Sequence, residues 1–146
     1  MPGPRHFLTV LSLALALPLG ARAESASSLQ SAFPRVDVKT GTAPIPFDDS
    51  AFARSQAEGL AVVVETYAPW CLSCRIQSPI LERLRSQEQF RNIVILRIGE
   101  KTPNAVWKRF KLHGYGTLVV FKGTSEVARG APTNEAALFE LLRSAT

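Results

Sequence analysis

The stretch TYAPWCLSCRIQSP, residues 66–79, contains both cysteines of this 146-residue chain, Cys71 and Cys74. It overlaps the end of LAVVVETY, residues 60–67, a nearly continuous apolar and β-branched run that is typical of a strand buried on both faces. Apolar residues then recur at helical spacing, at Ile76, Ile80, Leu81 and Leu84. The sequence therefore predicts a buried strand, the cysteine pair, and a helix that Pro79 kinks.

The position of the pair at the start of a helix has a chemical consequence. We expect the helix to begin at or just after Cys71 and to run to about Gln87. Unpaired N–H groups and the positive end of the helix dipole favour an anion there, so Cys71 is predicted to ionise more readily than a free cysteine. Cys74 lies one turn further on, close enough to attack a mixed disulfide formed on Cys71. Two thiols placed in this way can accept a disulfide from a partner or donate one.

The rest of the chain predicts further helices and strands around this unit. A helix with Asp48 or Asp49 as N-cap precedes the strand, in PFDDSAFARSQAEG. After the cysteine helix we expect a strand over 93–98 and a helix through Phe110 with Thr102 as N-cap and Pro103 in its first turn. A hairpin over 117–129 that turns at Gly123 and Thr124 and a final helix capped by Thr133 are expected to follow. This order predicts an α/β fold with a central mixed β-sheet flanked by helices.

The first 23 residues have the layout of a secretory signal peptide. A basic start at Arg5, an apolar stretch and the small-residue exit Ala21-Arg22-Ala23 predict cleavage before Glu24. An uncleaved membrane anchor is the alternative, but the apolar stretch is shorter than the roughly 20 residues that a spanning helix needs. We therefore expect a cleaved signal peptide over 1–23 and a periplasmic protein. An exported compartment is oxidising and lets a disulfide persist.

Between the signal peptide and the folded part, residues 24–41 are rich in Ser and Ala and are predicted to form a flexible leader, with one strand candidate at Arg35–Lys39. The domain itself is expected over 42–146. Removal of the first 23 residues would lower the formal charge from +5 to +3. The basic residues at 108–111 carry no nucleic-acid motif or aromatic platform, so we expect no nucleic-acid partner, and we expect a monomer.

The motif WC-x-x-C, preceded by a buried strand and followed by a proline five residues after the second cysteine, resembles the thioredoxin family. The similarity extends from Leu60 to about Arg143, and GYGTLVVFKG resembles the segment that follows the third helix of the family. The resemblance implies a thioredoxin-like fold in which Cys71 is the attacking cysteine and Cys74 the resolving one, with a reversible Cys71–Cys74 disulfide.

Other site residues follow from the same resemblance. Glu65, six residues before Cys71, corresponds to the buried acid that handles the proton of the resolving thiol. A carboxyl group buried in an apolar strand has a raised pKa and can exchange a proton near neutrality. A carboxylate pointing to solvent at the strand end is the alternative. Trp70 and Pro69 are expected to shape the surface around the cysteines.

Two features depart from the family pattern. Leu72-Ser73 replaces the Gly-Pro found between the cysteines of general thioredoxins, so the resemblance does not give the redox potential or the direction of exchange. Gly116 replaces a cis-proline opposite the cysteines, and a cis bond before a non-proline residue costs about 3 kcal/mol. The resemblance implies that Tyr115, Gly116 and Thr117 meet the substrate. Glycine preorganises this loop less, so we expect weaker or altered substrate binding.

These features predict an exported thiol–disulfide oxidoreductase that acts on protein thiols and disulfides. The dithiol carries both electrons, so no organic cofactor and no metal are implied, although a reductase would need a donor such as a membrane protein. One alternative is a copper-delivery protein of the same fold, with Cys71, Cys74 and His113 as ligands. Another is a binding module that keeps the fold without catalysis.

Overall fold

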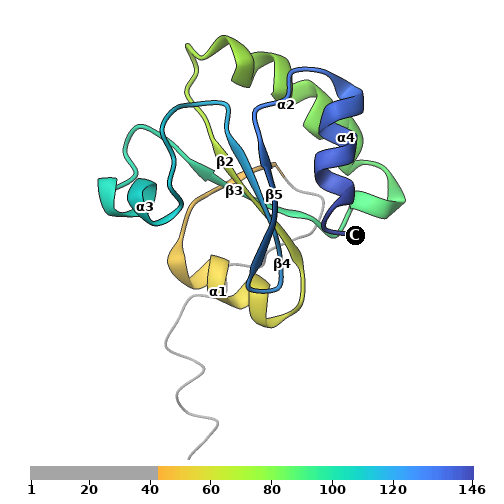
Figure 1. Cartoon of the computed structure of the whole chain (residues 1–146), viewed down its shortest axis with the longest axis horizontal. Coiled ribbons are helices and arrows are strands. Elements are labelled where there is room, and N and C mark those ends of the chain that lie inside the picture. The colour runs from red at the N-terminus through yellow and green to blue at the C-terminus, as the bar shows by residue number, and fades with distance from the viewer. Residues whose placement is uncertain (1–42) are drawn as a thin grey trace, which may run out of the picture. The chain divides into compact units, whose positions relative to one another are not determined.

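The structure is a computed structural model that describes residues 43–146. The predicted signal peptide, the predicted leader and the strand candidate Arg35–Lys39 lie outside the described residues. The elements, shown in Figure 1, are β1 (Ile45–Pro46), α1 (Asp49–Ala57), β2 (Ala61–Thr66), α2 (Leu72–Arg85), the 3₁₀ helix η1 (Glu88–Phe90), β3 (Val94–Ile98), α3 (Asn104–Arg109), β4 (Leu118–Lys122), β5 (Ser125–Gly130) and α4 (Glu135–Arg143).

The strands form one mixed sheet in the order β1-β3-β2-β4-β5. β1 and β2 both run parallel to β3, whereas β4 is antiparallel to β2 and to β5. β2 is therefore central, and its residues from Val62 to Thr66 are all buried. This burial explains the apolar run in the sequence, because both faces of β2 are covered by helices.

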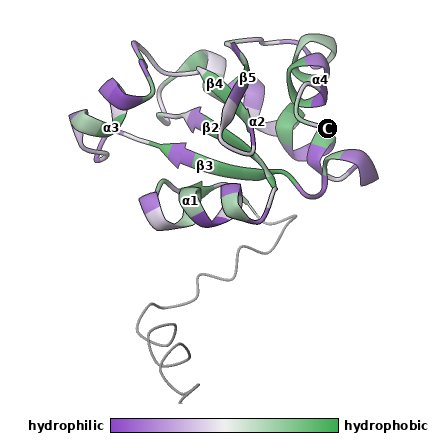
Figure 2. Cartoon of the chain, turned by 60° about the horizontal axis from the view of Figure 1, so that its bottom comes forward, coloured by the Kyte–Doolittle hydropathy of each residue, from purple (hydrophilic) through white to green (hydrophobic). Residues whose placement is uncertain are grey.

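Alternate residues of the strands build two separate cores. Val63, Ile95 and Val120 pack on one face against α2, η1 and α4. Val62, Val64 and Leu96 pack on the other face with residues of α1 and α3. Figure 1 shows α2 and α4 together on one side, and in Figure 2 the body of β3 is hydrophobic while the helices carry both hydrophobic and hydrophilic segments. The predicted mixed sheet flanked by helices is confirmed.

Local signals placed two of the four α-helix starts correctly, those of α1 at Asp48 and of α2 at Cys71. Asp48 caps α1 by accepting a hydrogen bond from the backbone N–H of Ala51 at 2.8 Å. The predicted caps of the last two helices were wrong by one residue: Pro103 and Asn134 occupy these positions. The Thr102 hydroxyl accepts a hydrogen bond from Gly99 N–H instead, and the Asn134 side chain caps Ala137 N–H.

The buried stripe of α2 also differs from the predicted one. Its deepest members, Cys74, Gln77, Leu81 and Leu84, follow a 3-4-3 spacing, whereas Ile76 is exposed. A polar residue, Gln77, thus occupies a core position. No helix within residues 43–146 is long and apolar enough to cross a membrane.

Candidate active site

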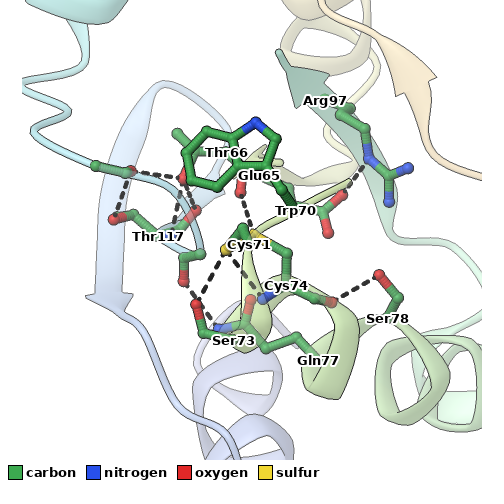
Figure 3. Close-up of a disulfide and its surroundings, with 12 residues drawn as sticks. Glu65, Thr66, Trp70, Cys71, Ser73, Cys74, Gln77, Ser78, Arg97 and Thr117 are labelled. Atoms are coloured by element: carbon green, nitrogen blue, oxygen red, sulfur yellow. Dashed lines mark hydrogen bonds and ion pairs between the residues drawn. A yellow bond between two sulfur atoms is a disulfide. The ribbon is translucent and has the colours of Figure 1, made fainter. Parts of the chain in front are cut away.

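Cys71 and Cys74 form a disulfide at the start of α2, with their Cα atoms 5.3 Å apart (Figure 3). Cys71 is the N-cap residue of α2, and Cys74 lies in its first turn. The two residues differ in access, because Cys71 is 8% exposed whereas Cys74 is 0% exposed. An incoming sulfur can therefore reach Cys71 first, and Cys74 is open mainly to Cys71.

Two donors point at the Cys71 sulfur. The backbone N–H of Cys74 donates to Cys71 Sγ at 3.2 Å, and the Ser73 hydroxyl lies 3.2 Å from the same sulfur (Figure 3). In the disulfide the sulfur carries no hydrogen, so the Ser73 hydroxyl is the donor. Both groups would stabilise a thiolate at Cys71 once the disulfide opens, and α2 has no acidic residue in its first turn to oppose them.

Cys74 packs against the end of β2. Its sulfur lies 3.6 Å from the backbone carbonyl oxygen of Thr66. Thr66 O also accepts the N–H of Gly116 at 2.9 Å, and Thr66 Oγ1 accepts the N–H of Thr117 at 2.8 Å. The same hydroxyl donates to Gly114 O at 2.9 Å. Thr66 therefore fastens the loop over residues 114–117 to the end of β2, the strand that precedes the cysteine pair.

Gly116 lies opposite the disulfide in a conformation that suits glycine. Its φ is +82°, and no peptide bond in the described part of the chain is cis. A Cβ at Gly116 would overlap the Ser73 hydroxyl and lie 3.2 Å from Ser73 Cβ. Proline fits this site poorly, because its φ is fixed near −65° and it lacks the N–H that Gly116 donates to Thr66.

Gln77 is fully buried beneath the same loop. Its Nε2 donates to Gly116 O at 2.8 Å and to Pro132 O at 2.9 Å, while its Oε1 has no partner among the described residues. One amide thus ties α2 to two loops, the loop before β4 and the loop between β5 and α4. The sequence analysis missed Gln77 and Thr66 and noted Ser73 only as part of an unusual dipeptide. A glutamine at a core position of an amphipathic helix was a visible signal for Gln77.

Aromatic side chains border the disulfide. Trp70 is 66% exposed, and its Nε1 donates to Glu100 at 2.7 Å. Its ring meets Tyr115 edge to face at 5.0 Å, and Tyr115 meets Trp107 in the same way at 5.2 Å. Pro69 is exposed and lines a cleft of about 720 Å³, which Glu100 also lines. Of the five residues predicted to shape the surface or to meet the substrate, Trp70 and Pro69 are exposed, Tyr115 and Thr117 are half-buried and Gly116 is buried.

Glu65 is buried at the end of β2, with 0% exposure. It lies directly opposite Arg97 of β3, whose Nε donates to Glu65 Oε2 at 2.8 Å. Burial raises the pKa of Glu65, and the hydrogen bond and positive charge of Arg97 only partly offset this effect. Its second oxygen, Oε1, has no hydrogen-bond partner among the described residues. The solvent-exposed alternative for Glu65 is therefore excluded.

The ion pair reaches solvent through Arg97. The Arg97 side chain is 28% exposed, stacks 3.9 Å from the centre of the Tyr67 ring and lines the cleft beside Pro69. Arg85, the last residue of α2, is also buried. Burial lowers the pKa of Arg85, and the negative charge of Glu65 acts against that shift. The Arg97 guanidinium thus lies between the cleft and the buried carboxylate of Glu65.

His113 belongs to a different part of the surface. It follows α3 and lines a small pocket with Trp107 and Lys108. Within residues 43–146, no three His, Cys, Asp or Glu side chains lie close enough together to hold a metal ion. The structure therefore does not bring His113 to the cysteine pair, and the copper site of three ligands loses its geometric support.

Comparison with known proteins places this site in a family. The thioredoxin family model matches residues 44–144. A thioredoxin from Coprinus comatus is 25% identical over 63% of this chain and 87% of its own. A protein disulfide-isomerase, erp38 of Neurospora crassa, is 32% identical over 57% of this chain, but the match spans only 22% of that relative.

Solved structures agree. Trxlp from Edwardsiella tarda has a TM-score of 0.65 and 31% identity, over 68% of this chain and 98% of that one. A thioredoxin mutant from Halobacterium salinarum, at 22% identity and a TM-score of 0.63, shares the fold. The chain belongs to the thioredoxin family, and the predicted thioredoxin-like fold is confirmed. The family and the disulfide support the class of thiol–disulfide oxidoreductases.

Proposed function

We propose that this chain is an exported thiol–disulfide oxidoreductase that exchanges disulfides with protein substrates. The observation that carries the proposal is the asymmetry of the pair. Cys71 is 8% exposed and its sulfur accepts two hydrogen bonds, whereas Cys74 is 0% exposed. Such an arrangement suits one attacking and one resolving sulfur.

The exchange balances with a substrate disulfide as the only co-reactant. The Cys71 thiolate attacks one substrate sulfur, the substrate S–S bond breaks, and the leaving thiolate takes a proton. The Cys74 thiol then loses its proton and attacks Cys71 Sγ, which releases the second substrate thiol and forms the Cys71–Cys74 disulfide. Two electrons pass from the dithiol to the substrate, and the reverse sequence oxidises a substrate dithiol.

Glu65 is the proposed acceptor of the proton from Cys74. Its unpaired Oε1 is available, and its raised pKa suits a group that takes up and returns a proton. Arg97 holds the other carboxylate oxygen through its Nε and itself lines the cleft, so the Glu65 carboxylate lies one side chain away from the protein surface.

The substrate peptide is proposed to lie along the loop at Tyr115. Both backbone polar groups of Gly116 are already occupied, by Thr66 O and by Gln77 Nε2. No hydrogen bond within the described residues uses the backbone N–H or C=O of Tyr115. Tyr115 can therefore pair with an extended segment of the substrate, while exposed Trp70 and Leu72 offer apolar contacts beside Cys71.

Export rests on the signal-peptide layout of residues 1–23 and would place the protein in an oxidising periplasm. The mass of the protein recovered from the cell envelope tests this: cleavage predicts a chain that starts at Glu24, and an intact Met1 would contradict it.

The activity is tested by turnover of a peptide that carries one disulfide, with glutathione as the electron source. We expect catalysis by the parent protein and at least a hundredfold lower rates for Cys71→Ser. Rates for Cys71→Ser equal to the parent would show that the dithiol is not the catalyst and that the fold serves binding alone.

A further inference from the structure

Ser73 and Gly116 come from distant parts of the sequence and meet at the Cys71 sulfur. Ser73 lies in the first turn of α2, and Gly116 lies in the loop before β4. The Ser73 hydroxyl is 3.2 Å from Cys71 Sγ and fills the space that a Cβ at Gly116 would need. The two residues are therefore sterically coupled: the hydroxyl can hold its position on the sulfur only if residue 116 has no side chain.

From this contact we infer that Ser73 is a catalytic residue, whose hydroxyl donates a hydrogen bond to the Cys71 thiolate. Gly116 is a positioning residue, which leaves space for the Ser73 hydroxyl. The inference rests on the proposed disulfide exchange and names two groups that set the reactivity of its attacking sulfur.

The direction of this hydrogen bond follows from the chemistry of the two atoms. A thiolate can only accept hydrogen bonds, so the serine hydroxyl must donate. A hydrogen bond to a charged acceptor is stronger than one to a neutral acceptor, and it therefore favours the ionised form of Cys71. The backbone N–H of Cys74 supplies a second donor, which any residue at position 73 would leave in place.

The conformation of Gly116 keeps the pair together. Its backbone N–H is bound by Thr66 and its C=O by Gln77, so the loop cannot easily move away from Ser73. A side chain at residue 116 must therefore displace the Ser73 hydroxyl, because these two hydrogen bonds hold the backbone of residue 116 in place. The φ of +82° adds strain for any residue with a Cβ.

The test measures the rate at which iodoacetamide alkylates Cys71 in the reduced full-length protein between pH 4 and pH 10, with mass spectrometry to resolve the two cysteines. We expect Ser73→Ala to raise the pH midpoint by about one unit, which is about a tenfold loss of thiolate below the midpoint. The rate at high pH should not fall, because a more basic thiolate is at least as nucleophilic.

Ser78→Ala is the matched control, because Ser78 lies on the same helix and its hydroxyl bonds to Cys74 O at 2.9 Å, not to a sulfur. It should leave the midpoint unchanged, and Ser73→Thr, which keeps a hydroxyl, should restore most of the parental midpoint. Equal midpoints for Ser73→Ala and Ser78→Ala would overturn the role of Ser73.

Gly116→Ala tests the coupling. It should raise the midpoint of the parent protein by displacing the hydroxyl, and it should have no further effect in the Ser73→Ala background. The same shift in both backgrounds would overturn the role of Gly116, and Ser73→Ala alone still decides the role of the hydroxyl if Gly116→Ala does not fold. A parent protein whose Cys71 is alkylated normally but that does not turn over a disulfide would instead refute the proposed function.

Discussion

Gln77 offers a sharp test of how the site is held together, through the variant Gln77→Leu. Leucine fills a similar volume but removes the Nε2 group that donates to Gly116 O and Pro132 O. Gly116 is buried, so its carbonyl would lose its partner without access to water, whereas the half-buried Pro132 carbonyl can be rehydrated.

The magnitude follows from these two environments. An unsatisfied buried carbonyl costs about 1–3 kcal/mol, and the partly exposed hydrogen bond contributes about 0.5–1.5 kcal/mol. Leucine also removes Gln77 Oε1, which is buried without a partner, and this recovers part of the loss. We therefore expect Gln77→Leu to lower the free energy of unfolding by about 2 kcal/mol.

The assay is urea unfolding of the oxidised protein, so that the disulfide is the same in every sample. Gln56→Leu is the matched control, because Gln56 Nε2 donates to a single backbone carbonyl, that of Gly123, at 2.8 Å in a half-exposed turn. It should lower the free energy of unfolding by only about 0.5–1 kcal/mol. Equal losses for the two variants would refute the idea that Gln77 binds the two loops.

Two further changes test the buried charge and the core. Burial raises the pKa of Glu65, so the folded protein holds this proton more tightly than the unfolded chain, and stability falls as the pH rises above the ordinary value of 4.5 toward the folded-state pKa. Glu65→Gln should therefore have nearly the same free energy of unfolding as the parent near pH 4. Above pH 4 it should become increasingly more stable than the parent, by about 1.4 kcal/mol for each unit by which the pKa of Glu65 is raised. Urea unfolding from pH 4 to pH 9 measures this difference, and a difference that does not depend on pH would contradict the prediction. Leu138→Ala should lower the free energy of unfolding by about 2–5 kcal/mol because Leu138 is fully buried under the sheet. The half-buried Leu141→Ala is its control, and equal losses would show that Leu138 is not a core residue.

The chain contains enough local information to predict its main elements. The apolar run of β2, the Asp48 cap and the turn at Gly123 all identified structure that is present, because each depends on residues close together in the sequence. β1 was missed because two residues, one of them a proline, carry no recognisable strand pattern. The final helix is capped by Asn134 and not by Thr133; two capping residue types stand side by side there, and asparagine is the stronger N-cap residue.

The site was predictable where one motif contains it and unpredictable where distant segments meet. The motif located Cys71 and Cys74, and the acid in an apolar strand indicated Glu65. Ser73 was noticed only as part of an unusual dipeptide, because its contact with Gly116 joins residues 43 positions apart. The partner of Glu65 likewise depends on the register of β2 and β3, which sets Arg97 opposite it.

The most direct test of the account asks which sulfur is attacked first. Reduced Cys74→Ser and Cys71→Ser proteins are each mixed with a disulfide-bonded peptide, and the mixed disulfides are mapped by mass spectrometry. We expect a long-lived adduct on Cys71 in Cys74→Ser, and a far slower reaction of the fully buried Cys74 in Cys71→Ser. Adducts that form equally fast on both sulfurs, or on neither, would contradict the account.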